Sequence, residues 1–278
     1  MRVTRFLIGR LIKVTANALK GCCYPIHVVF PNARFTIPSA SPALLRRTRH
    51  KRIPRVVWQT NFTNRVTLPI YLNYLFNRLM SPTCAYRFMT DEGCLEFIRA
   101  TYPGPVLDAY VNLRIGAARA DFWRVLVLLE HGGVYIDMDA NLMWPLEALI
   151  SDDDRELFIL DRAHRVTNFF LASEPKNPLL AKTVDSILAN IHSETETDVF
   201  NLTGPGAMKA ALADAQFNAE RQRYVCDQGN FTNEFFQYAD HPRGKWTREQ
   251  RTTSLLIRSK ASDAGPSDPA RTRRSNTS

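Results

Sequence analysis

The sequence predicts an α/β fold, in which strands alternate with helices. Short β-branched or aromatic runs recur between longer segments whose apolar residues have helical spacing, and glycine or proline stands at most of the junctions. The chain has 278 residues, of which 45% are hydrophobic and 23% charged, so it can bury a sizeable core. In such folds ligands bind at the carboxyl ends of the strands, and we expect the functional residues there.

Two strand–helix units are predicted in the first half of the chain. Residues 55–59 form a short β-branched run after a proline and predict a buried strand, and residues 68–79 show helical spacing of leucine and phenylalanine. Residues 86–89 predict a second strand. Asp91 is then expected to cap a helix that ends near residue 102.

The strongest predicted helix covers residues 113–131. It contains good helix formers and no proline, and the pair Gly132-Gly133 ends it. Residues 134–136 predict a strand that leads into Asp137-Met138-Asp139. These two carboxylates therefore stand at the carboxyl end of a strand.

The alternation continues through the second half of the chain. Pro145 is expected to start a short helix. Further strands are predicted at residues 157–160, 169–172, 224–226 and 235–238, and further helices at residues 178–191 and 204–212.

Composition divides the chain into three regions: a basic leader (1–50), a central domain (51–257) and a tail (258–278). Prolines at positions 25, 31, 38 and 42 are expected to break regular structure in the leader. The tail consists largely of Ser, Asp, Pro, Ala and Arg with almost no apolar residue, so we expect it to be disordered.

The net charge of +9 favours anionic partners, among them phospholipids and phosphorylated substrates. Nucleic acid is not expected, because no nucleic-acid-binding motif accompanies the basic clusters. The five cysteines are odd in number and fit neither a disulfide framework nor a CxxC metal pair. Reduced thiols and a cytoplasmic location are therefore expected.

Residues 6–19 are moderately apolar but contain Arg10 and Lys13, and they are too short to span a membrane, which takes about 20 apolar residues. If this segment is helical, Leu7, Leu11 and Val14 share one stripe with basic residues beside it. That pattern suits either a helix lying on the inner face of a membrane or a terminal helix packed on the protein.

The two carboxylates of Asp137 and Asp139 can converge on one cation. Hard divalent ions take carboxylate and phosphate oxygens as ligands, and such an ion can stabilise the charge on a departing nucleoside diphosphate. A pair of aspartates alone is a weak signal, because it also fits a solvated or capping pair. Asp152-Asp153-Asp154, for example, is expected in a surface loop.

Asp121 and Arg124 lie three residues apart on the preceding helix and share one of its faces. They are either an ion pair on the solvent side, which contributes little, or they reach the site at the end of the next strand. In the second case Asp121 would accept hydrogen bonds from sugar or ribose hydroxyls. Arg124 would bind donor hydroxyls or phosphate.

Residues 117–124 (AARADFWR) and 131–139 (HGGVYIDMD) together resemble glycosyltransferase family 32. This DxD-containing group is related to initiating α-mannosyltransferases and to capsular and lipopolysaccharide sugar transferases, and its layout is similar to that of the clostridial glucosylating toxins. Weaker matches bring the resemblance to roughly residues 53–246; they stand at 53–60, 86–91, 168–172, 203–205 and 241–246.

The resemblance implies a Rossmann-like fold of GT-A type with a small acceptor-side extension, and retaining stereochemistry. It implies catalytic roles for Asp121, Arg124, Asp137 and Asp139. Mn²⁺ or Mg²⁺ would be bound by Asp139, by Asp137 and by His241 as a candidate third ligand, and Asp137 would also contact hydroxyls of the donor.

The resemblance also implies that Trp58, Gln59 and Thr60 line the nucleotide pocket. For Trp246 two roles stay open: it closes over the donor, or it is a core residue. Two departures bear on these assignments. Trp58 and Asn61 replace a His and a Trp that are common at the start of the family's pattern, and Gly244-Lys245 replaces the usual Gly-Ser before the tryptophan.

The expected function is transfer of a hexose from a UDP- or GDP-sugar to a glycan or lipid-linked acceptor, in the synthesis of lipopolysaccharide, capsule or another surface polysaccharide. Three alternatives stay open. The chain could be a protein-glycosylating effector of the toxin type, a non-catalytic sugar-nucleotide-binding protein, or a metal-dependent phosphotransferase.

Overall fold

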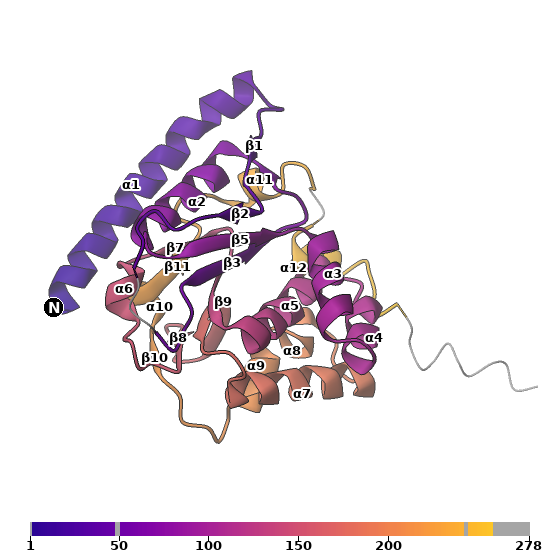
Figure 1. The fold of residues 1–278 in the computed structure, drawn as a ribbon. Coiled ribbons are helices and arrows are strands. Elements are labelled where there is room, and N and C mark those ends of the chain that lie inside the picture. Colours follow the sequence, from indigo (N-terminus) through magenta and orange to yellow (C-terminus); the bar gives the residue numbers. More distant parts are fainter. Residues whose placement is uncertain (1, 48–50, 242–243, 258–278) are drawn as a thin grey trace, which may run out of the picture.

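The computed structural model describes residues 2–47, 51–241 and 244–257, and it confirms the predicted α/β class. Its central sheet has the strand order β10–β8–β9–β6–β3–β5–β2 (Figure 1). The strands are β2 (Ala40–Ser41), β3 (Val56–Thr60), β5 (Ala85–Met89), β6 (Gly133–Ile136), β8 (Glu156–Leu160), β9 (Val166–Ser173) and β10 (Ala219–Arg221). Two short pairs lie outside this sheet: β1 (Phe35–Thr36) with β4 (Arg65–Val66), and β7 (Ala140–Leu142) with β11 (Cys226–Gln228).

The sheet is mixed, and its parallel part positions the site. Strand β3 runs parallel to both β5 and β6, so the carboxyl ends of these three strands meet at one edge. Strand β9 is antiparallel to β6, with Ile136 opposite Phe170, and therefore begins at the same edge. Strand β8 is antiparallel to β9, β10 is parallel to β8, and β2 is antiparallel to β5.

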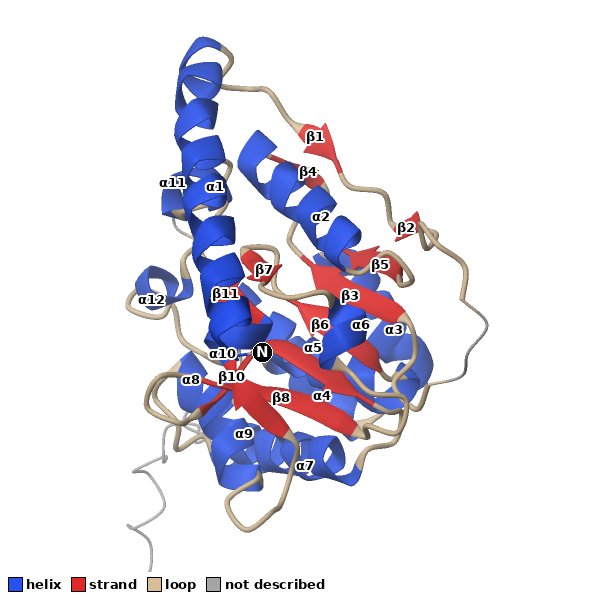
Figure 2. Ribbon diagram, turned by 90° about the vertical axis from the view of Figure 1, so that its left-hand side faces the viewer, coloured by secondary structure: helices blue, strands red, loops and turns tan. Residues whose placement is uncertain are grey.

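Helices cover both faces of the sheet and give the molecule two hydrophobic cores (Figures 1 and 2). On one face lie α3 (Asp91–Thr101), α4 (Pro105–Asn112), α5 (Gly116–His131), α7 (Pro178–Ser193), α8 (Val199–Leu202) and α9 (Pro205–Ala211). On the other lie α2 (Leu68–Met80), α6 (Leu146–Leu149), α10 (Gln222–Val225) and, outermost, α1 (Arg2–Val29). The short helices α11 (Glu234–Gln237) and α12 (Trp246–Glu249) complete the chain as described.

Helix α5 forms the centre of the first core, with Phe122 and Trp123 fully buried. It ends where predicted, at Gly132 and Gly133, whose φ angles of 64° and 105° favour glycine. A Cβ atom on Gly133 would lie 2.7 Å from the carbonyl oxygen of Val56. These glycines therefore let β6 start directly beside β3. Helix α4, which precedes α5, was not predicted.

Two predicted strands near the end of the chain were wrong. Residues 222–225 form helix α10, and the strand β11 begins only at Cys226. Residues 234–237 form helix α11, because the Asn233 side chain accepts a hydrogen bond from the Phe236 amide and caps the turn. Short apolar runs do not distinguish strand from helix by pattern alone.

The structure also bears on the predictions for the start of α3 and for the aspartates after α6. Thr90, not Asp91, caps α3, since its side chain accepts a hydrogen bond from the Gly93 amide. The aspartates at 152–154 lie in a loop after α6, as predicted.

The segment predicted as a basic leader is largely structured. Helix α1 continues through Pro25, so the expectation that this proline breaks regular structure was wrong. Pro25 and Gly21, whose carbonyl loses its helical partner there, are both exposed, and water can satisfy that carbonyl. Strand β2 joins the central sheet. The division at residue 50 stays a prediction, and the predicted tail (258–278) lies outside the described residues.

Candidate functional site

A cleft of about 670 Å³ opens at the edge where β3, β5 and β6 end, as predicted from the sequence. The turns after these strands, the start of β9, the first turns of α5 and the segment of α11 and α12 form its walls. Its volume is typical of a site for a small ligand. The polar side chains that converge in it therefore define the candidate site.

Asp137 and Asp139 lie in the turn between β6 and β7. The Tyr135 hydroxyl donates a hydrogen bond to Asp137 Oδ1 at 2.6 Å. Gln228 Nε2 donates to both carboxylates, at 3.3 Å to Asp137 Oδ2 and 3.1 Å to Asp139 Oδ1. The two carboxylates thus converge on one nitrogen atom.

Asp121 and Arg124 reach this turn from α5. Arg124, which is only 5% exposed, places Nη2 3.0 Å from Asp121 Oδ1 and 3.3 Å from Asp137 Oδ1. Its Nη1 donates to the Asn168 carbonyl at 2.9 Å, and its guanidinium lies 4.5 Å from the centre of the Tyr135 ring. The structure therefore excludes an ion pair on the solvent side of the helix.

The site carries more negative than positive charge. Burial, with Asp137 nearby, raises the pKa of Asp139 to about 7. Burial also raises the pKa of Asp121 to about 6, although Arg124 opposes this shift. Three carboxylates thus share one guanidinium, and a cation would relieve their repulsion.

The donor set of Asp137 and Asp139 fits a hard divalent cation. Mg²⁺ is commonly held by one or two carboxylates with substrate phosphates and waters as its other ligands. Within residues 2–47, 51–241 and 244–257, no group of three His, Cys, Asp or Glu side chains is close enough to hold a metal ion.

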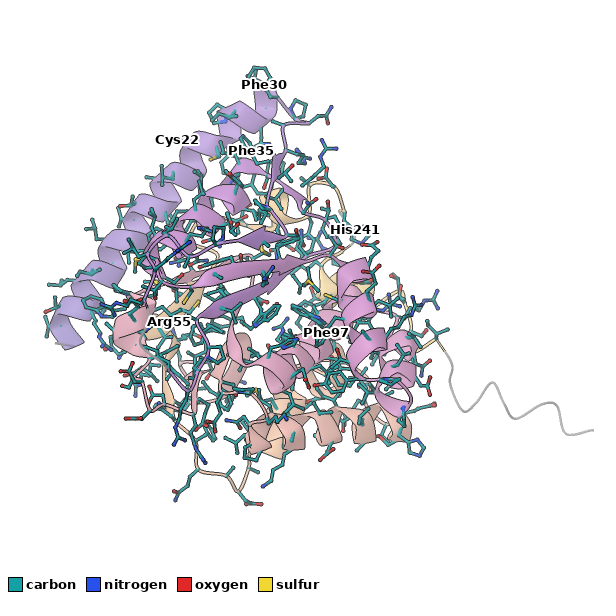
Figure 3. The ribbon with its side chains drawn as sticks, viewed as in Figure 1. Cys22, Phe30, Phe35, Arg55, Phe97 and His241 are labelled. Carbon is teal, nitrogen blue, oxygen red and sulfur yellow. The ribbon has the colours of Figure 1, made fainter. Side chains whose placement is uncertain are left out.

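His241 and Trp246 lie in the wall of the cleft formed by the last segment of the described chain. His241 stands near the strand ends (Figure 3), with its ring 5.6 Å from that of Phe62. Burial raises the pKa values of Asp91 and Glu249, and the nearby His241 opposes this rise in both. The roles of His241 as a metal ligand and of Trp246 as a lid stay predictions.

The structure does not bring Trp58 and Gln59 into the cleft, contrary to expectation. The Trp58 indole donates to the Gly132 carbonyl at 2.9 Å and stacks on His131. Gln59 is buried and donates to the Ile136 carbonyl at 3.4 Å. Strand β3 reaches the edge of the sheet only at its last residue, so Thr60 lines the cleft together with Asn61 and Phe62.

Three residues in direct contact with the site were not predicted as site residues: Gln228, Tyr135 and Asn168. Asn168 Nδ2 donates to Asp121 Oδ1 at 2.9 Å. Tyr135 and Asn168 lie within the stretches that carry the family resemblance, which was a usable signal. Gln228 lies in a separate strand, far along the chain from the aspartates that it contacts, and no local pattern marks it.

Comparison with known proteins defines the class of this site. Residues 49–156 match the family described as "Glycosyltransferase sugar-binding region containing DXD motif". This segment contains Asp121, Arg124, Asp137 and Asp139. The four predicted site residues thus lie within the part of the chain that matches this family, and the predicted family resemblance is confirmed.

Curated relatives share this region. The chain is 32% identical over 109 residues to a mannosyl phosphorylinositol ceramide synthase of Saccharomyces cerevisiae, covering 39% of this chain and 28% of the relative. It is 27% identical over 199 residues to an initiation-specific α-1,6-mannosyltransferase of Schizosaccharomyces pombe, covering 59% and 49%. The chain thus spans less than half of each relative.

Among solved structures, the PaToxG glycosyltransferase aligns with 76% of this chain and 79% of its own at 15% identity, with a TM-score of 0.47. Within the described part of the chain, no helix combines the length and apolar character needed to cross a membrane.

Proposed function

We propose that this chain is a metal-dependent retaining glycosyltransferase that moves a hexose from a nucleoside diphosphate sugar to a glycan or lipid-linked acceptor. The observation that carries the proposal is the convergence of Asp137 and Asp139 on one nitrogen atom of Gln228, beside the buried Arg124. A cation bound by these two carboxylates would lie at the wall of the cleft.

Asp139 and Asp137 would hold Mn²⁺ or Mg²⁺. When bound, the cation would neutralise the charge that develops on the diphosphate as its bond to the sugar breaks. The raised pKa of Asp139 supports this assignment, because the carboxylate lacks a compensating positive charge of its own. Asp137 differs from Asp139 in also bonding Tyr135 and Arg124, which fix its position.

Arg124 and Asp121 would hold the donor sugar. Two carboxylates and two backbone carbonyls fix the Arg124 guanidinium, so its charge is preorganised at the cleft. Asn168 and Arg124 both bind the same oxygen of Asp121, Oδ1. The second oxygen of Asp121 would accept a hydrogen bond from a sugar or ribose hydroxyl.

For the chemical step we propose substitution on one face of the sugar. The bond between the anomeric carbon and the diphosphate oxygen breaks while the acceptor oxygen bonds to that carbon on the same face. The acceptor proton passes to a departing diphosphate oxygen. This route assigns no covalent nucleophile to the chain, and a trapped glycosyl–enzyme adduct would overturn it.

The names of the relatives suggest which substrates to test first. Both name mannosyl transfer or synthesis, and one names a phosphorylinositol ceramide product. We therefore propose mannose as the first donor sugar to test, with a lipid-linked acceptor. From the sequence, we further propose that the transfer takes place at the inner face of a membrane, in the synthesis of lipopolysaccharide, capsule or another surface polysaccharide.

The test is a nucleotide-release assay with purified protein, Mn²⁺ and a panel of UDP- and GDP-sugars. The Asp137→Ala/Asp139→Ala variant is compared with Asp152→Ala/Asp154→Ala, which removes two aspartates at the same spacing from a loop outside the cleft. Wild type and the loop variant should release nucleotide only with metal, and the cleft variant should be at least roughly 100-fold slower.

Binding of nucleoside diphosphate with and without Mn²⁺, measured by calorimetry, gives a second readout. If no member of the panel is turned over but metal-dependent binding is lost only in the cleft variant, the acceptor is missing from the assay and the site assignment holds. If wild type neither binds nor releases any nucleotide sugar, the proposal fails.

A further inference from the structure

Helix α1 packs on the protein through its small residues. Gly9, Ala16 and Cys23 are buried on one side of the helix, at spacings of seven residues. A Cβ atom on Gly9 would lie 3.1 Å from Met143 Cε, which shows how closely the helix approaches the body. Figures 1 and 2 show α1 running along the outside of the molecule beside α2. Most large apolar side chains of α1 therefore lie on its other faces.

The outward face of α1 is apolar and exposed. Val3, Leu7, Leu11 and Val14 follow one another at helical spacing and are 72%, 60%, 65% and 68% exposed. Val28, Val29 and Phe30 continue the exposed apolar surface at the far end of the helix, where Phe30 projects from the molecule (Figure 3). A helix of 28 residues is about 42 Å long. A surface helix normally turns such a stripe towards the core.

The charge around this stripe is positive. Helix α1 contains no Asp or Glu residue. Arg10 is exposed beside the stripe, with its guanidinium 5.2 Å from the Phe6 ring. Arg5 and Arg47 both reach α6, through the Ala148 carbonyl and the Glu147 carboxylate, so the basic loop after β2 lies beside the first turns of α1.

We propose that α1 lies in the plane of an anionic phospholipid bilayer. The stripe Val3-Leu7-Leu11-Val14 would enter the boundary between headgroups and acyl chains, and Arg10 would contact lipid phosphates. A second copy of the chain is a less suitable partner for this face of α1, because two copies of a helix without acidic residues would bring like charges together. Free phosphate alone would leave the apolar stripe exposed to water.

Membrane binding through α1 extends the proposed function and rests on it. The bilayer would be the surface from which a lipid-linked acceptor reaches the cleft. The last turns of α1 pack on α11: the Tyr24 and Phe236 rings lie 4.6 Å apart, and His27 contacts Phe236 as well. Gln237 and Tyr238, which follow, line the cleft. A membrane-bound α1 would thus hold one wall of the cleft near the bilayer.

The test measures co-sedimentation of the 278-residue chain with vesicles of phosphatidylcholine alone and of phosphatidylcholine with phosphatidylglycerol. Leu7→Gln/Leu11→Gln/Val14→Gln removes the stripe without adding charge. The matched control is Val111→Gln/Ile257→Gln, two exposed apolar residues (39% and 57%) on other elements. All changed side chains are exposed, and circular dichroism checks that each variant is folded.

Wild type and the control variant should bind the anionic vesicles, and the triple variant should bind them at least roughly tenfold more weakly. Arg10→Gln should weaken binding to anionic vesicles and leave binding to phosphatidylcholine unchanged. Equal binding by wild type and the triple variant would overturn the proposal. The proposal would also be overturned if wild type were a dimer in sedimentation velocity without lipid and the triple variant were a monomer. The readout needs no turnover, so its failure is distinguishable from failure of the proposed function.

Discussion

At the residue scale, the Tyr135 hydroxyl orients Asp137 with a 2.6 Å hydrogen bond, while the ring of Tyr135 supports Arg124. Tyr135→Phe keeps the ring and removes only the donor. A hydrogen bond to a charged group contributes about 1.5–3 kcal/mol, so we expect kcat/KM to fall roughly tenfold or more. Steady-state kinetics with the donor found in the release assay measures this.

Tyr102→Phe is the control, because its hydroxyl bonds the Leu126 carbonyl and Glu130 on α5 and does not line the cleft. Its kcat/KM should equal that of wild type. If both variants lose activity equally, the Tyr135 hydroxyl does not act through Asp137.

Arg124 stabilises the fold as well as the site. Arg124→Met would leave Asp121 and Asp137 without the guanidinium that separates their charges. Removing one partner of a buried ion pair costs about 3–5 kcal/mol, and we expect a loss of that size in the free energy of unfolding in urea. Adding Asp121→Asn should recover part of the loss.

Arg78→Met is the control for this stability measurement. Arg78 is similarly buried, but its described partners are the Pro42 carbonyl, the Tyr74 hydroxyl and the rings of Tyr74 and Tyr86, with no carboxylate among them. It should therefore destabilise the fold less. An equal loss in both variants would show that Arg124 contributes through packing rather than through charge.

The predictable residues of the site are those that local patterns connect. Asp137 and Asp139 follow a strand, and Asp121 and Arg124 share one face of the helix before it, so spacing alone brings them together. Gln228 was not predicted, because it is brought to the aspartates by the pairing of β11 with β7, which is a long-range contact. Trp58 was expected in the nucleotide pocket from a local pattern, but it lies too early in β3 to reach the edge of the sheet where the cleft opens.

At the element scale, the junction between α5 and β6 depends on glycine. Gly133→Ala would place a methyl group 2.6 Å from Val56 Cγ1 and 2.7 Å from Val56 O, at a φ of 105°. We expect a loss of about 2–4 kcal/mol in the free energy of unfolding, from strain and steric conflict together. Thermal and urea denaturation measure it.

Gly116→Ala tests the other end of the same helix. A Cβ atom there would meet no atom within 4 Å, so stability should stay unchanged or rise slightly. If Gly133→Ala proved equally harmless, β6 would not need its close approach to β3.

The elements themselves were mostly predictable, because strands such as β3, β5 and β8 are short β-branched or aromatic runs and helices such as α5 and α7 are long. Helix α11 was taken for a strand, since its four residues hold too little pattern and its cap, Asn233, acts through a side chain. For α1, the stripe of Leu7, Leu11 and Val14 was predictable, but the direction in which it faces was not. That direction depends on the small residues that pack against the body.

At the scale of the whole molecule, α1 is linked to the candidate site at two points on either side of Gln228. Lys13 forms an ion pair with Asp227, and Lys20 donates to the Gly229 carbonyl at 2.8 Å. The residue between them bonds both aspartates of the DxD triplet. The first helix of the described chain therefore fixes the segment whose Gln228 side chain contacts both aspartates.

Lys13→Gln/Lys20→Gln should loosen this segment and lower the affinity for metal and nucleoside diphosphate about threefold to tenfold, because Gln228 would no longer be held between two fixed neighbours. Calorimetry with Mn²⁺ and the diphosphate measures the change. Arg165→Gln, which removes an ion pair with Asp161 between β8 and β9, is the matched control and should bind as wild type does. If the double variant also bound normally while Gln228→Ala did not, the strand pairing of β11 alone would position Gln228, and α1 would serve only to present its outer face.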